Sequence, residues 1–205
     1  MRKEHFRRKV MKNCSKNYNW SLKCYLIIFI SKGTIIGVKK EVNCMNIQKF
    51  TQKSIEAINN CEKIAYDYGN QEIDQEHFLY SLMTIEDSLI ANLIEKMNID
   101  KDIFLKNIEQ LLNQKNKVSG DVKLYISNDL NKVLVNAEDE AKRMGDSYVS
   151  VEHLMLALIA APNRAIKQLF KTYGINRESF LSVLATVRGN QTVTSDNPEA
   201  TYDTL

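Results

Sequence analysis

An internal duplication constrains the fold of this chain more than any other feature of its sequence. Aligning each residue with the residue 76 positions later, without a gap, superposes 50–112 on 126–188. Twelve of the 63 pairs are identical, where average amino-acid usage gives about four by chance. The identical pairs include Gly69/Gly145, Glu76/Glu152, His77/His153, Leu82/Leu158 and Phe104/Phe180. Such a repeat predicts two copies of one structural unit packed together.

Each copy carries four helix-start signals at the same spacing. They are short polar side chains that can accept hydrogen bonds from first-turn amides, and they form the pairs Thr51/Ser127, Asp74/Ser150, Asp87/Asn163 and Asp100/Asn176. Helix-stop residues that tolerate the left-handed conformation recur as Gly69/Gly145 and Asn98/Gly174. The pattern predicts helices over 52–68, 75–85, 88–97 and 101–113, and over 128–144, 151–161, 164–173 and 177–188.

The apolar residues follow the same helices. In the first helix we expect the buried stripe to contain Ile55, Ile58, Ala65 and Tyr68, with Ile64 beside it. The second helix of each copy, HFLYSLM or HLMLALIAA, is apolar nearly all round and should lie in the centre of the core. We therefore predict an all-α domain, in which two four-helix repeats related by a pseudo-twofold axis form one eight-helix globule.

The chain divides into a basic leader and an acidic body. Residues 1–44 carry a net charge of +9 and the remainder carries −6. We expect translation to start naturally at Met45, with 1–44 an extension outside the domain; a basic membrane- or RNA-binding arm and an unrelated extension are the alternatives. The domain is then predicted over 45–189, with repeats at 50–113 and 126–188, and residues 190–205 begin a flexible linker.

Charge and cysteine usage exclude several classes of function for the body. Its acidic balance argues against a nucleic-acid surface, which needs clustered positive charge. The short apolar run 25–30 in the leader is too short to span a membrane. The cysteines match neither a zinc site nor a disulfide framework, so Cys61 reads as a small buried side chain in a reducing cytoplasm. We expect no metal and no cofactor.

Four strings in this order resemble the Clp amino-terminal domain: FTQKSIEAI, GNQEIDQEHFLYSL, GDSYVSVEHLMLAL and GINRESF. The resemblance covers about 45–190. The tail VRGNQTVTSDNPEATYDTL is similar to the stretch with which ClpB-type disaggregases enter their first ATPase module. No GxxxxGK[ST] phosphate-binding loop occurs in the sequence, so we expect a binding domain without enzyme activity. The resemblance implies that its parent protein is a hexameric ATPase ring.

The resemblance implies a function and a set of residues. It implies binding of unfolded or aggregated polypeptide, which the ATPase ring then receives. The substrate-binding residues that it suggests are Thr51, Asp146 and Glu152, and the equivalent positions in the repeat add Glu76 and Ser127. The family also uses an apolar groove, although this chain has the polar residues Asn136 and Glu140 at groove positions.

Two alternatives remain for Glu76 and Glu152. Each carboxylate lies in the first turn of a helix, which favours a negative charge without any ligand. Each could also border a surface cleft, Glu76 with Thr51 and Glu152 with Ser127, and bind the cationic group of a ligand. In the ClpC branch, such positions imply a phosphoarginine reader or an adaptor-docking module. His77 and His153 start helices, and we expect them to fill space and bond nearby carbonyls.

Overall fold

A computed structural model describes residues 47–118, 123–189 and 191–196. The chain divides into the units Met1–Glu41 and Val42–Leu205, and every described residue belongs to the second. The prediction for 1–44 therefore lies outside the described residues, and the domain boundaries at 45 and 189 stay predictions. No helix in the described ranges is long and apolar enough to cross a membrane.

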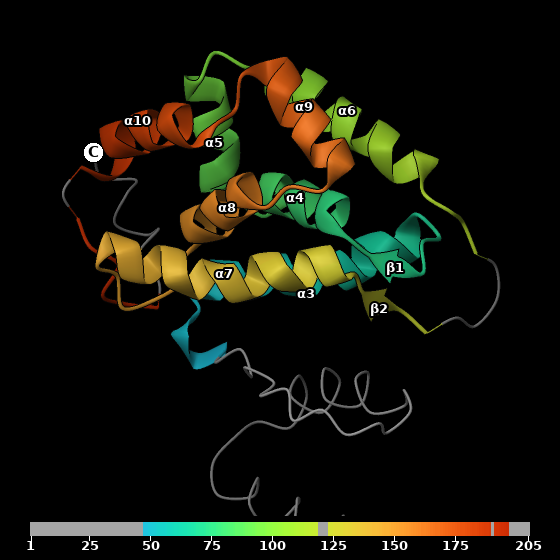
Figure 1. The fold of residues 1–205 in the computed structure, drawn as a ribbon, viewed down its shortest axis with the longest axis horizontal. Helices are drawn as coiled ribbons and strands as arrows, with labels where there is room; N and C mark the ends of the chain where they lie inside the picture. Colours follow the sequence, from blue (N-terminus) through green and yellow to red (C-terminus); the bar gives the residue numbers. More distant parts are fainter. Residues whose placement is uncertain (1–46, 119–122, 190, 197–205) are drawn as a thin grey trace, which may run out of the picture. The chain divides into compact units, whose positions relative to one another are not determined.

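Helices make up nearly all of the regular structure in the described ranges, which confirms the predicted all-α class (Figure 1). A short 3-10 helix, η1 (Ile47–Lys49), precedes them. The first repeat contains α3 (Gln52–Asp67), α4 (Gln75–Thr84), α5 (Leu89–Lys96) and α6 (Lys101–Gln114), and the second contains α7 (Asn128–Met144), α8 (Val151–Ala160), α9 (Arg164–Tyr173) and α10 (Arg177–Arg188). Each end lies within one residue of the predicted position.

Local capping chemistry explains this agreement, with one exception. Seven of the eight predicted N-cap residues occupy that position. The prediction for Asp87 is wrong, because Ser88 caps α5 by accepting a hydrogen bond from the amide of Ala91 at 3.0 Å. Asp87 instead takes a positive φ of 50° in the turn before the cap. At the helix ends, Asn98 and Gly145 have the positive φ expected of left-handed stops.

Two short parallel backbone pairings join the two repeats. Strand β1 (Glu72–Ile73) of the first repeat pairs with β2 (Tyr125–Ile126), which leads into α7 of the second. Conversely, Val149 of the second repeat pairs with Phe50, which leads into α3 of the first. The amide of Ser127 donates to Ile73 O at 2.8 Å, and the amide of Thr51 donates to Val149 O at 3.0 Å. This exchange is the pseudo-twofold relation predicted from the repeat.

Helices α4 and α8 form the centre of the core, as predicted. They lie between the pair α3 and α7 on one side and the other four helices on the opposite side (Figure 1). Eight consecutive residues of α8, from Val151 to Leu158, are buried. Four phenylalanines, three from the first repeat and one from the second, are among the largest fully buried side chains: Phe50, Phe78, Phe104 and Phe180.

The buried face of α3 differs from the prediction. Ala65 and Ile64 are buried as predicted, but the other buried residues are the small Ser54, Ala57 and Cys61, whereas Ile55, Ile58 and Tyr68 are half-buried. Small side chains let α3 approach α4 closely enough for Ser81 Oγ to donate to Ala57 O at 2.7 Å. Cys61 is buried as predicted, and its burial raises the pKa of the thiol.

The segment after α10 also differs from the flexible linker that we expected. Residues 191–196 lie against the domain, and the side chain of Val193 is fully buried. The polar composition of this segment predicted mobility, but a single valine and three backbone or side-chain hydrogen bonds to Asp146, Ser147 and Gln52 hold it in place.

Candidate functional site

The two histidines close the first turns of the central helices. Nδ1 of His77 accepts a hydrogen bond from the amide of Asp74 at 3.0 Å, and Nδ1 of His153 accepts one from the amide of Ser150 at the same distance. Burial, followed by the charge of Lys115, lowers the pKa of His77 to about 4. His77 is therefore neutral near pH 7, and each ring caps the first turn of its helix.

The second ring nitrogen of each histidine contacts the residue seven positions earlier. Nε2 of His77 lies 3.0 Å from Asn70 Oδ1, and Nε2 of His153 lies 2.8 Å from Asp146 Oδ2. Asn70 and Asp146 are themselves related by the repeat spacing of 76. We had expected a carbonyl partner, but a side chain from the turn before each helix supplies the oxygen. The partner of the histidine ring is thus a neutral amide in the first repeat and a carboxylate in the second.

Around Glu76, six polar residues form a network that we call the polar junction: Asp74, Gln75, Glu76, Lys115, Ser127 and Asn163. Lys115 Nζ lies 2.9 Å from Asp74 and 2.8 Å from Glu76. Ser127 Oγ donates to Asp74 at 2.6 Å, and Asn163 Nδ2 donates to Glu76 at 3.0 Å. Because Ser127 and Asn163 belong to the second repeat, the polar junction joins the two copies.

The charges of the polar junction are well matched. Burial alone would raise the pKa of Asp74, but hydrogen bonds from Ser127 and Lys115 outweigh it and leave that pKa lowered. Burial would likewise lower the pKa of Lys115, but Glu76 and Asp74 outweigh it and raise that pKa. Asp74 and Lys115 are therefore held in their charged forms, although both are largely removed from water.

At the equivalent place in the second repeat, Asp146, Glu152, His153 and Arg188 form what we call the exit cluster. Arg188 pairs with Asp146 and lies 3.6 Å from Glu152. The side chains of both carboxylates have no exposed surface. Burial would raise the pKa of Asp146, but hydrogen bonds from His153, Arg188 and the amide of Val193 outweigh it and lower that pKa to about 2.

The five predicted site residues are all found within these networks or beside them. Thr51, Glu76, Ser127 and Glu152 are at most 6% exposed, and the side chain of Asp146 is fully buried. Their polar atoms already bind partners inside the domain. A ligand could reach them only if those partners moved, so their assignment as substrate-binding residues stays a prediction.

The pairing of these residues also differs from the prediction. We expected Thr51 beside Glu76 and Ser127 beside Glu152. The exchanged pairings instead bring Ser127 to Asp74, two residues before Glu76, and bring Thr51 to Val149, three residues before Glu152. Each helix start thus faces the other repeat.

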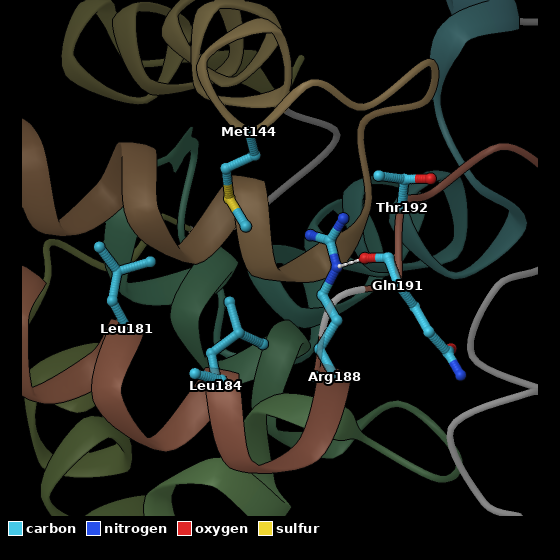
Figure 2. A pocket seen from close by; sticks show the side chains of 8 residues that line it. Met144, Leu181, Leu184, Arg188, Gln191 and Thr192 are labelled. Atoms are coloured by element: carbon cyan, nitrogen blue, oxygen red, sulfur yellow. Dashed lines mark hydrogen bonds between the residues drawn. The ribbon is translucent and has the colours of Figure 1, made fainter.

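An open hollow of about 250 Å³ lies next to the exit cluster. Figure 2 shows Met144 pointing from the end of α7 toward Leu181 and Leu184 of α10, with the guanidinium of Arg188 at one end. Gln191 and Thr192, which follow α10 in the chain, also line the hollow. Its centre is therefore apolar and its rim is polar.

The groove positions that the family resemblance suggested on α7 are polar here. Asn136 is exposed. Glu140 is only 2% exposed, and it accepts hydrogen bonds from Arg143 at 2.7 Å and from Arg177 of α10 at 2.8 Å. This ion-pair cluster links α7 to α10.

A family model, the Clp repeat (R) N-terminal domain, matches residues 49–173. Among curated proteins, the ClpB chaperone protein of Bacillus anthracis is 39% identical over 165 residues, and that of Clostridium tetani is 38% identical over 165 residues. Each match covers 78% of this chain but only 19% of the relative. The chain therefore spans about a fifth of the length of these relatives.

Solved structures share the fold. The Hsp104 N-terminal domain from Candida albicans has a TM-score of 0.63 at 23% identity, covering 74% of this chain and 99% of that one. A ClpV N-domain in complex with a VipB peptide has a TM-score of 0.58 at 17% identity, covering 79% and 100%. The repeat, the exchanged pairings and these matches agree: the chain belongs to the family of Clp repeat N-terminal domains, in the form found in ClpB-type chaperones.

Proposed function

We propose that this domain binds exposed apolar segments of unfolded or aggregated polypeptides for a ClpB-type disaggregase. The observation that carries the proposal is the 39% identity to ClpB chaperones over 165 residues. In a longer chain of that type, the captured segment would pass to an ATPase ring. The domain itself would bind and release, without chemistry of its own.

The hollow beside α10 offers a place for such a segment. Its volume of about 250 Å³ is below the roughly 300–1,000 Å³ typical of pockets that enclose small ligands. It suits an apolar side chain of a passing polypeptide better than a metabolite. Backbone groups of the segment would stay in water at the polar rim, so binding would depend little on sequence.

A site of this size predicts weak binding. Specific stable interfaces bury about 1,200–2,000 Å² in total, and a contact confined to this hollow would bury far less. Weakness suits a receptor that must release its cargo. In a hexameric ring the same site would recur on every subunit, and the high effective concentration would offset the low affinity of each copy.

The main rival is an adaptor- or phosphoarginine-binding module of the ClpC or ClpA type. The ClpV N-domain solved with a VipB peptide is a relative in fold that binds a defined peptide. A phosphoarginine reader would need a carboxylate open to a guanidinium. Lys115 and Arg188 already lie against Glu76 and Glu152, which weighs against that alternative.

Fluorescence anisotropy with a labelled, permanently unfolded casein tests the proposal. We expect Leu181→Ser, in the hollow, to weaken binding several-fold, because the change replaces apolar lining with a hydroxyl. Leu105→Ser is the matched control, since Leu105 is the repeat equivalent of Leu181 and is also half-buried on its helix, α6. Equal affinities for the two variants would place the segment elsewhere.

The rival makes a different prediction for the same assay. A phosphoarginine peptide would bind the wild-type chain, casein would not, and Glu76→Gln combined with Glu152→Gln would abolish peptide binding. Circular dichroism must show that the double variant remains folded, because both carboxylates are buried. That pattern of results would replace the proposed function with the reader.

A further inference from the structure

Residues 191–196, which we call the exit strap, touch both repeats. The amide of Val193 donates to Asp146 Oδ1 at 2.7 Å, and its carbonyl accepts from the amide of Ser147 at 3.0 Å. Farther along, the carbonyl of Asp196 accepts from the amide of Gln52 at 2.9 Å. Gln52 begins α3, where first-turn amides have no partner within the helix. The exit strap therefore runs from the turn before α8 to the start of α3.

One side chain fastens the beginning of the exit strap. Arg188 Nε donates to the carbonyl of Gln191 at 2.7 Å (Figure 2). Its NH2 group binds the same oxygen of Asp146 that accepts the amide of Val193. Arg188 is only 4% exposed. The end of α10, the exit strap and the turn before α8 thus meet at Asp146.

The first repeat docks its own exit segment at the equivalent place. The amide of Val118 donates to the carbonyl of Gly69 at 2.8 Å, and Asn70 Nδ2 donates to the carbonyl of Asn116 at 3.3 Å. Asn70 also pairs with Lys117, and these two residues correspond to Asp146 and Val193 at the repeat spacing of 76. Both repeats therefore dock the segment that follows their last helix on the turn before their second helix.

The second copy differs from the first in charge. Asn70 and Leu112 of the first repeat correspond to Asp146 and Arg188. Charge-assisted hydrogen bonds are roughly twice as strong as neutral ones. Arg188 and Asp146 therefore supply charge-assisted bonds to the second exit segment, whereas the first is held by neutral bonds at Asn70 and by the ion pairs of its own Lys115.

We infer that Asp146 is a positioning residue: with Arg188 and Glu152 it holds the exit strap and so sets where the chain leaves the domain. Gln191 and Thr192 of the exit strap also line the hollow, so its docking sets one wall of that hollow. Asp146 influences capture of a polypeptide through the exit strap and not by touching the captured segment. This last step rests on the proposed function, whereas the docking does not.

Amide hydrogen exchange of the 205-residue chain, followed by NMR, tests the docking. The reporters are the amides of Ser147 and Gln52, which bond to the exit strap and not to the side chain of Asp146. Loss of charge-assisted bonds in Asp146→Ala is expected to speed their exchange by about tenfold or more. The amide of Leu154 in α8 should keep its protection, which shows that the domain stays folded.

Two further variants make the exchange result specific. Asp146→Asn copies Asn70, a residue that the first repeat accommodates at the same turn, and should speed exchange less than Asp146→Ala. Asn70→Ala is the matched control in the first repeat and should leave the Gln52 amide unchanged. Unchanged exchange at both reporters in Asp146→Ala would overturn the inference.

Casein affinity separates positioning from direct contact. Val193→Asp puts a charge at a buried apolar position and should release the exit strap while Asp146 is intact. If Asp146→Ala and Val193→Asp change the affinity by the same factor, Asp146 acts through the exit strap; different factors would refute that role. If the wild-type chain binds no casein, the proposed function fails, and the exchange experiment still decides whether Asp146 holds the exit strap.

Discussion

Replacing Arg188 by leucine should destabilise the domain by about 3 kcal/mol. Removing one partner of a buried ion pair typically costs about 3–5 kcal/mol, because the other charge stays buried without compensation. Arg188 is 4% exposed and serves two buried carboxylates. Asp146 keeps its bonds to His153 and to the amide of Val193, which favours the lower end of the range. At about 2–4 °C per kcal/mol, the melting temperature should fall by about 6–12 °C.

The first repeat supplies a variant that should recover part of this loss. Leu112, Asn70 and Lys115 correspond at the repeat spacing to Arg188, Asp146 and Gln191. The triple change Arg188→Leu, Asp146→Asn and Gln191→Lys therefore installs the arrangement of the first repeat in the second. One buried negative charge is removed, and the new lysine occupies the position that corresponds to Lys115. We expect at least half of the lost stability to return.

Urea unfolding followed by circular dichroism measures both variants against the wild-type chain. Agreement between the denaturant slopes would show that the same surface is exposed in each case. A loss below about 1 kcal/mol for Arg188→Leu, the size of an exposed ion pair, would contradict the account of the exit cluster. A triple variant no more stable than the single one would contradict the equivalence of the two repeats.

Three other properties should follow from the structure. Because the pKa of His77 falls from 6.5 to about 4 on folding, the unfolded chain takes up a proton at a higher pH than the folded chain does. The free energy of unfolding should therefore fall as the pH is lowered from 6.5 to 4, and His77→Gln should flatten this slope. Gly145→Ala should lower the free energy of unfolding by about 1–2 kcal/mol, because alanine disfavours the φ of +76° at this position. No atom lies within 4 Å of the added methyl group, so the cost comes from the backbone alone; an unchanged urea midpoint would refute this. Cys61 is buried and the pKa of its thiol is raised, so peptide mapping should show maleimide labelling of Cys61 only in denaturant.

The helices could be predicted because their ends depend on local chemistry. Thr51, Asp100 and Asn176 cap helices through their own side chains, whatever the rest of the fold does. The miss at Asp87 arose because Ser88, the next residue, is an equally good cap. The buried face of α3 was misjudged because close approach to α4 favours Ala57 and Cys61 over larger side chains, and that approach depends on the tertiary packing.

The candidate site was predictable only in part, because its cations come from distant segments. Glu76 and Glu152 could be found from their positions in the repeat. Lys115 and Arg188 could not be found in this way, because the two cations are not separated by the repeat spacing of 76. Asn70 and Asp146 recur seven residues before His77 and His153, and this spacing could have identified them as the partners of the histidine rings. Docking of the exit strap depends on Val193, whose polar neighbours gave no sign of burial.

Differential scanning calorimetry tests most directly the claim that two exchanged repeats form one cooperative body. A single transition is expected, with the calorimetric and van't Hoff enthalpies equal, because Thr51 and Ser127 each depend on the other repeat for their backbone partners. Two transitions, or a calorimetric enthalpy about twice the van't Hoff value, would show that the repeats unfold independently and would contradict the account.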